Sequence, residues 1–168
     1  MEEQIALLRR LWSGQGATSD VGAIGPQPVQ AGGPEILIGG FAPAAVRRAG
    51  RLADGYLGPG ADAATLQSLY GVVEKAWNAA GRPGKPRLVV GTYYALGPNS
   101  EERGTPFLRD YSRFQPDGGA GMTQRSLFSD EAVRQRIQTY SDIGVDELVL
   151  WPTVIDSEQF DRLAQVVG

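Results

Sequence analysis

Two adjacent glycines, Gly39 and Gly40, stand between a short apolar run and a segment of helical periodicity. The run at 35–38 is typical of a buried parallel strand, and Pro43 has the fixed φ and missing N–H that suit the first turn of a helix. A strand that passes through Gly-Gly into a helix leaves backbone N–H groups pointing at one place, which is the chemistry of a phosphate site. An ordinary tight turn is the alternative, because turns commonly use glycine.

The chain contains no histidine and no cysteine. This composition excludes Ser-His-Asp and Cys-His nucleophilic machinery, thiolate zinc sites and His-based metal triads. Any chemistry must come from carboxylates, tyrosines, arginines or a bound cofactor, which carries the reactive atom while protein groups bind and orient it. The sequence identifies no individual catalytic residue and no metal site.

Aromatic residues near the ends of two predicted strands are candidates for a substrate pocket. Tyr93 and Tyr94 lie near the end of the strand predicted at 87–96, and alternation sends one side chain inward and the other outward. Trp151 ends the last predicted strand at the same rim. The inward tyrosine and Trp151 either line a pocket or pack in the core, and the sequence leaves both roles open.

The irregular segment at 99–129 is locally basic and aromatic. Its residues of these two kinds are Arg103, Arg109, Arg113, Arg125, Phe107, Tyr111 and Phe114. Three roles suit it: a lid over an anionic substrate or cofactor tail, a solvated excursion, or an arm for a dimer contact. Within the segment, 100–111 has helix potential and 115–121 is predicted as a loop.

Alternating strands and helices must position these candidates. The strands are predicted near Ile36, Tyr56, Leu88 and Leu148. The helices are predicted at 2–13, 44–53, 61–81, 129–143 and 157–167. Strands that alternate with helices indicate an α/β fold with a parallel sheet.

Length and charge exclude several classes of protein. A chain of 168 residues predicts a single domain over 1–168, with 99–129 as an irregular insertion. The net charge of −3, without a basic stripe, gives no reason to expect a nucleic-acid partner. The N-terminus lacks a basic leader, and no apolar run approaches the roughly 18 residues of a membrane span. We therefore expect a cytoplasmic protein without a membrane partner.

Four stretches, taken together, identify a family resemblance. They are LRRLWSG at 8–14, the Pro- and Gln-rich loop at 26–34, GGFAPAAVRRAGRLADGY at 39–56 and YSDIGVDELVLWP at 140–152. With these, the chain resembles the C-terminal half of the luciferase-like monooxygenase superfamily, TIM-barrel oxidoreductases that use FMN or the deazaflavin coenzyme F-420.

The resemblance implies a cofactor site as well as a fold. It assigns the cofactor phosphate to the backbone of Ile38, Gly39, Gly40 and Phe41. Ala42 stands where a serine or similar cap often precedes such a helix, so one hydroxyl partner for phosphate is absent. The implied activity is that of a flavin- or deazaflavin-dependent oxidoreductase or monooxygenase acting on a small molecule.

Four βα units make half of a (β/α)₈ barrel, whose complete form takes about 250 residues. A half barrel leaves two strand edges open and exposes the apolar interior of the sheet. We expect two copies to close these edges as a homodimer. A truncated fragment and an open α/β sandwich are the alternatives.

Two functions from different classes follow from this sequence. The first is the luciferase-like oxidoreductase, with the cofactor phosphate bound after the first strand. The second is a non-catalytic half-barrel module for binding or assembly, or a fragment without activity, because fold alone does not carry activity. The absence of the half that ordinarily supplies the pocket facing the isoalloxazine ring favours the second.

Overall fold

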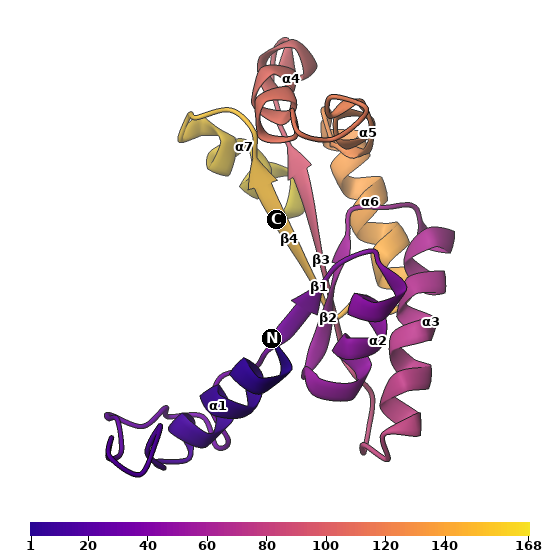
Figure 1. The fold of residues 1–168 in the computed structure, drawn as a ribbon. Coiled ribbons are helices and arrows are strands. Elements are labelled where there is room, and N and C mark those ends of the chain that lie inside the picture. Colours follow the sequence, from indigo (N-terminus) through magenta and orange to yellow (C-terminus); the bar gives the residue numbers. More distant parts are fainter.

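Four parallel strands form one sheet in the order β1-β2-β3-β4 (Figure 1). The computed structural model describes residues 1–168. Its strands are β1 (Leu37–Gly39), β2 (Gly55–Pro59), β3 (Arg87–Tyr94) and β4 (Glu147–Pro152). Every neighbouring pair is parallel, so the predicted α/β class is confirmed.

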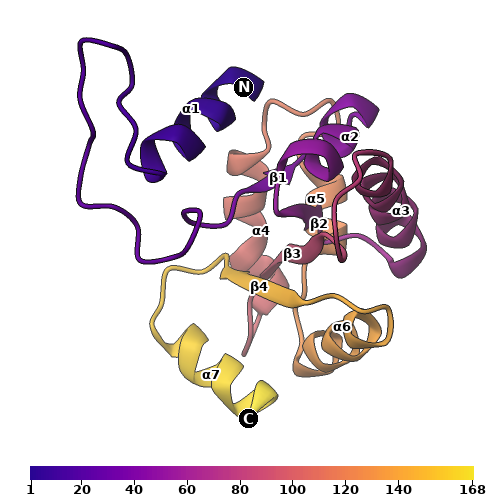
Figure 2. The same cartoon turned by 90° about the horizontal axis from the view of Figure 1, so that it is seen from below.

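Seven helices accompany the sheet. They are α1 (Glu2–Trp12), α2 (Pro43–Leu52), α3 (Ala63–Ala79), α4 (Ser100–Tyr111), α5 (Ala120–Arg125), α6 (Asp130–Asp142) and α7 (Glu158–Val167). Figure 2 shows α2, α3 and α6 following one another around the outside of the curved sheet, with α7 beyond β4. In Figure 1, α4 and α5 lie past the arrowheads of β3 and β4, at the carboxyl ends of the strands. None of the seven combines the length and apolarity that crossing a membrane requires.

The two faces of the sheet have different surroundings. On the helix-covered face, Ile38, Tyr56 and Leu88 lie in register and join Val46 of α2 and Leu66 of α3 in the main core. Because side chains alternate along a strand, the residues between them point to the opposite, inner face, which the helices leave open except where α4 contacts Tyr93 near its carboxyl end. This inner face is the side that faces the centre of a closed barrel.

The segment at 99–129 is more regular than its sequence indicates. The expected helix at 100–111 is present as α4, but the expected loop at 115–121 ends in a further short helix, α5. The Asp117 carboxylate accepts hydrogen bonds from the N–H groups of Gly119 (3.0 Å) and Gly121 (2.8 Å), which organises the turn into α5. Local side-chain to backbone bonds of this kind are invisible to periodicity.

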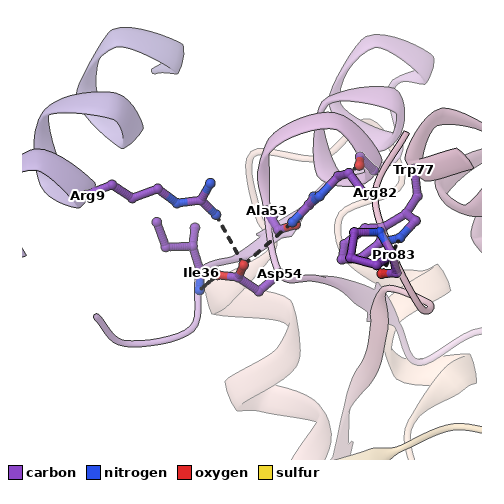
Figure 3. A network of polar contacts seen from close by, with 8 residues as sticks. Arg9, Ile36, Ala53, Asp54, Trp77, Arg82 and Pro83 are labelled. Atoms are coloured by element: carbon purple, nitrogen blue, oxygen red, sulfur yellow. Dashed lines mark hydrogen bonds and ion pairs between the residues drawn. The ribbon is translucent and has the colours of Figure 1, made fainter. Parts of the chain in front are cut away.

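Charged side chains tie the amino end of the sheet to its surroundings. The Asp54 carboxylate accepts hydrogen bonds from the N–H of Ile36 (2.9 Å) and the guanidinium of Arg9 on α1 (3.1 Å), and it pairs with Arg82 at 3.6 Å (Figure 3). The Arg82 guanidinium also lies 3.6 Å from the ring centroid of Trp77. This network holds α1, the start of β1 and the turn before β3 together.

A second ionic group lies at the same end of the inner face. Arg87 pairs there with both Glu35 and Glu147. Glu147 therefore has a partner within the sheet, far along β4 from Trp151 at the carboxyl end.

Candidate functional site

A cavity of about 290 Å³ lies at the carboxyl ends of the strands. All four strands reach it, and so does the segment that carries α4 and α5. Its lining residues are Gly39, Gly40, Phe41, Leu57, Gly58, Pro59, Gly60, Gly91, Thr92, Tyr93, Tyr111, Met122, Arg125, Ser126 and Trp151. The cavity therefore contains residues from both groups of candidates, the glycine turn and the aromatic strand ends.

The glycine turn after β1 has a fixed shape. Gly40 has a φ of +135°, a conformation that residues with a side chain rarely adopt, and an added Cβ would lie 3.0 Å from the Cβ of Ala45. The hydroxyl of Tyr56, a fully buried residue of β2, donates a hydrogen bond to the Gly40 carbonyl oxygen at 2.8 Å. The core of the protein thus sets the orientation of the turn.

Backbone donors in this turn are free. The N–H groups of Gly40, Phe41 and Ala42 donate no hydrogen bond to another residue of the chain. Consecutive free N–H groups at a cavity and at the start of a helix form a site for an acceptor.

The N-terminus of α2 lacks the side-chain cap that α3 and α6 possess. Ala42 occupies the N-cap position without a side-chain hydrogen bond, and the first turn of α2 contains no acidic residue. In contrast, the Asp62 carboxylate accepts from the N–H of Thr65 at 2.9 Å in α3, and the Ser129 hydroxyl accepts from the N–H of Ala132 at 3.1 Å in α6. The positive end of the α2 dipole is therefore left without a side-chain anion or hydroxyl.

Ile38, whose backbone the resemblance grouped with the glycine turn, directly precedes that turn, but its side chain does not contribute to the cavity. Its side chain is buried among the helices, 7% exposed, and it does not line the cavity. The residue is inside β1, where alternation points its side chain away from the inner face.

An aromatic cluster forms the wall of the cavity beside the glycine turn. The ring centroid of Tyr93 lies 5.4 Å from that of Trp151, 6.0 Å from that of Tyr111 and 6.2 Å from that of Phe107. The Trp151 indole lies against Gly91 so closely that any side chain at position 91 would overlap it. Trp151 remains 38% exposed, so one part of its ring is free to contact a ligand.

Tyr94 belongs to the core and not to the cavity. It is fully buried on the helix-covered face, and its hydroxyl donates to the backbone oxygen of Gln159 at 3.2 Å. Alternation along β3 therefore places Tyr93 inward and Tyr94 outward, a choice that the sequence had left open.

The tyrosine hydroxyl in the cavity is held in its protonated form. Burial, and next the nearby Tyr111 hydroxyl, raises the pKa of Tyr93 to about 12. At neutral pH this group is a hydrogen-bond donor and not a base.

The basic segment contributes one of its arginines to the cavity. Arg125, at the end of α5, lines it. Arg103 instead pairs with Asp156 at 3.3 Å, and Arg113 pairs with Asp110 at 2.8 Å. Of the aromatic residues in the segment, Tyr111 lines the cavity, Phe107 packs on Tyr93 and Phe114 is exposed.

Several lining residues escaped the sequence analysis. Met122 lies in α5 and Ser126 directly follows it, an element that periodicity did not reveal, and Gly91 is a glycine within an otherwise continuous strand. A glycine inside a strand often marks a close approach of another group, and that signal was available at position 91. The Gly-Pro-Gly sequence at 58–60 carries a similar signal, because it follows β2 at the same rim.

Solved structures with similar folds are larger than this chain. An F-420-dependent secondary alcohol dehydrogenase, solved with an F-420–acetone adduct, has a TM-score of 0.74 and 15% identity, covering 99% of this chain and 61% of its own. A coenzyme F-420-dependent tetrahydromethanopterin reductase from Methanopyrus kandleri has a TM-score of 0.71 and 15% identity, with coverage of 99% and 60%. A monooxygenase from Streptomyces bottropensis has a TM-score of 0.63 and 16% identity, with coverage of 98% and 57%.

These likenesses establish the architecture. The chain spans about 60% of the length of the first two structures, and its four strands with their helices match half of a luciferase-like TIM barrel, as the sequence predicted. No curated protein matches the sequence. The sequence model of the luciferase-like monooxygenase family matches residues 1–155. Because this match takes in most of the 168 residues, the chain belongs to the luciferase-like monooxygenase family.

Proposed function

We propose that the cavity binds FMN or coenzyme F-420 and that the completed barrel is a flavin- or deazaflavin-dependent oxidoreductase. The observation that carries this proposal is the turn after Gly39, where the free N–H groups of Gly40, Phe41 and Ala42 meet the uncapped N-terminus of α2. Free amides together with a helix N-terminus favour a phosphate, which both cofactors carry. The cavity suits these cofactors in two other ways. Its aromatic wall can pack against a ring system, and no carboxylate among its lining residues would repel a phosphate.

The residues of the chain have separable roles in this proposal. The amides of Gly40 and Phe41 hold the phosphate, and the Tyr56 hydroxyl keeps their turn in place. Tyr93 and Trp151 pack beside the ring system, and the protonated hydroxyl of Tyr93 donates a hydrogen bond toward it. The bound cofactor supplies hydride transfer, for which the side chains of this family member offer no substitute.

The barrel needs a second half, and we propose that a second copy of the chain supplies it. Phe41 is 66% exposed and Trp151 38% exposed on the open side of the cavity. The strands β1 and β4 form the two free edges of the sheet, and a two-fold axis along the barrel would pair β1 of each copy with β4 of the other. In this arrangement residues 1–168 act as one (βα)₄ domain with 99–129 as an insertion at the mouth of the cavity.

One observation favours a second candidate function. The lining residues include no carboxylate, imidazole or thiol, so the cavity has no conventional group for proton transfer at neutral pH. A non-catalytic binding or assembly module would need none. Such a module would keep the fold and the oligomeric contacts without cofactor chemistry.

Light scattering coupled to absorbance, after incubation with FMN or F-420 and removal of excess, separates the two candidates. We expect a dimer mass that elutes together with the absorbance of the cofactor. A protein that elutes colourless after incubation with each cofactor would overturn the oxidoreductase and leave the binding module. A monomer mass would contradict the homodimer.

A further inference from the structure

Arg125 is the one charged residue among the fifteen that line the cavity. The other lining residues are glycines, apolar residues or uncharged polar ones. A single cation at an otherwise neutral and partly aromatic cavity attracts an anionic group of a ligand more strongly than the same cation in open solvent.

The chain holds Arg125 at the rim of the sheet. Two residues beyond it, the N–H of Leu127 donates to the oxygen of Tyr93 and the oxygen of Leu127 accepts from the N–H of Ala95, each at 2.9 Å. Leu127 is 3% exposed and belongs to the second core cluster with Tyr94. The chain after α5 is thus fixed to the end of β3, which keeps the backbone of Arg125 at the rim of the cavity, while its side chain is exposed.

Arg125 forms no ion pair with a carboxylate of the chain, although the Asp117 carboxylate lies near enough for the Arg125 charge to help lower its pKa. No carboxylate oxygen lies within 4.0 Å of its guanidinium, in contrast to Arg103 and Arg113 in the same segment. The carboxylate of Asp117, which precedes α5, accepts from two backbone N–H groups instead. The five guanidinium donors are therefore available to a ligand.

We propose that Arg125 binds a phosphate or carboxylate group of the molecule that occupies the cavity. This inference rests on the proposed function in that it concerns the same cavity, but it adds a side-chain contact to an anion, either beside the amides after β1 or at a different anionic group. The planar guanidinium suits both groups, because it donates two parallel hydrogen bonds to neighbouring oxygens. The anion is either the cofactor phosphate or an acidic group on an aromatic substrate seated against Tyr93 and Trp151.

Two pairs of probes distinguish these sources. FMN and riboflavin share the ring and ribityl chain and differ in the phosphate; 2-naphthoate and 2-naphthamide share an aromatic ring and differ in the carboxylate. Dissociation constants for all four are measured by calorimetry on the full chain, on Arg125→Gln and Arg125→Lys, and on the control Arg109→Gln. Arg109 is a matched control because it is an exposed arginine of α4 outside the cavity. Far-UV circular dichroism verifies that each variant folds.

We expect Arg125→Gln to weaken one anionic probe by about 10- to 100-fold, the range of a charge-assisted hydrogen bond, and to leave its neutral partner unchanged. If Arg125→Gln loses affinity for FMN, Arg125 contacts the cofactor phosphate. If it loses affinity for 2-naphthoate, Arg125 contacts a carboxylate of the substrate. Arg125→Lys should retain part of the affinity, and Arg109→Gln all of it. The proposal is overturned if Arg125→Gln binds all four probes as the unaltered chain does, or if the unaltered chain prefers neither anionic probe. The naphthoate pair requires no cofactor, so failure of the flavin assignment is distinguishable from failure of this one.

Discussion

The substitution Ala42→Asp tests the phosphate assignment by placing a carboxylate where the phosphate is proposed to bind. Ala42 has φ −64° and ψ 134°, the extended conformation that suits an N-cap aspartate. Its carboxylate would accept the N–H groups at the start of α2, which no side chain now uses. The change should therefore stabilise the free protein and abolish binding of the ligand.

The two effects have separate magnitudes. A new N-cap contributes about 1 kcal/mol, which raises the Tm of a domain of this size by about 2–4 °C. A unit charge about 5 Å from a phosphate, at an effective dielectric constant of about 20, costs roughly 3 kcal/mol, or more than 100-fold in affinity. Stability and affinity thus move in opposite directions, which simple misfolding cannot produce.

The matched control is Ala42→Asn. Asparagine caps a helix about as well as aspartate does but carries no charge, so it should raise Tm similarly and change affinity far less. Thermal unfolding followed by circular dichroism gives the stability, and titration with FMN and with F-420 gives the affinity. If Ala42→Asp binds either cofactor as tightly as Ala42→Asn does, the phosphate of that cofactor does not lie at the N-terminus of α2.

Three further changes test the supports of the site. Gly91→Ala should displace the indole of Trp151, cost about 1–3 kcal/mol of stability and shift tryptophan emission to longer wavelength; unchanged emission would contradict the packing. Tyr56→Phe removes the hydrogen bond to Gly40 and should lower the free energy of unfolding by about 1 kcal/mol while weakening cofactor binding; an unaltered affinity would show that the turn needs no such support. The backbone N–H that Asp62 caps lowers the pKa of its carboxyl below the ordinary 3.8, so its contribution to stability is complete above that pH and declines as pH falls through the lowered value. In Asp62→Asn, the free energy of unfolding should therefore fall less steeply between pH 5 and pH 2 than in the unaltered chain, as measured by denaturation at each pH. The same pH dependence in both proteins would refute the assignment.

The strands were predictable because each is a short apolar run between turn residues, and burial on the helix side enforces that pattern. The strand predicted at 35–38 is present as Leu37–Gly39, so it includes the first glycine of the predicted turn, and the strand predicted at 87–96 is present as Arg87–Tyr94. Periodicity also fixes which residues share a face, but it does not say which face is covered. Tyr93 and Tyr94 were consequently equivalent in the sequence and became distinct only when α6 and α7 covered one side of the sheet.

The candidate site was less predictable than the fold because two of its features depend on contacts between distant segments. The position of Arg125 depends on the pairing of Leu127 with the end of β3, which no local pattern encodes. The role of Gly91 depends on the indole of Trp151, sixty positions along the chain. The free amides after β1 were anticipated from the Gly-Gly pair, since a glycine turn into a helix is a local feature.

The ionic network around Asp54 has a consequence for how this chain can diversify. Together with the Arg87 group, it concentrates long-range charged anchors at the amino end of the strands, whereas the cavity occupies the carboxyl end. Substitutions at sites that share no neighbours have nearly additive effects on stability. Substitutions at the carboxyl end of the strands can therefore change which ligand binds, while the ion pairs at the amino end continue to stabilise the fold. This separation allows the binding site to evolve without loss of the fold.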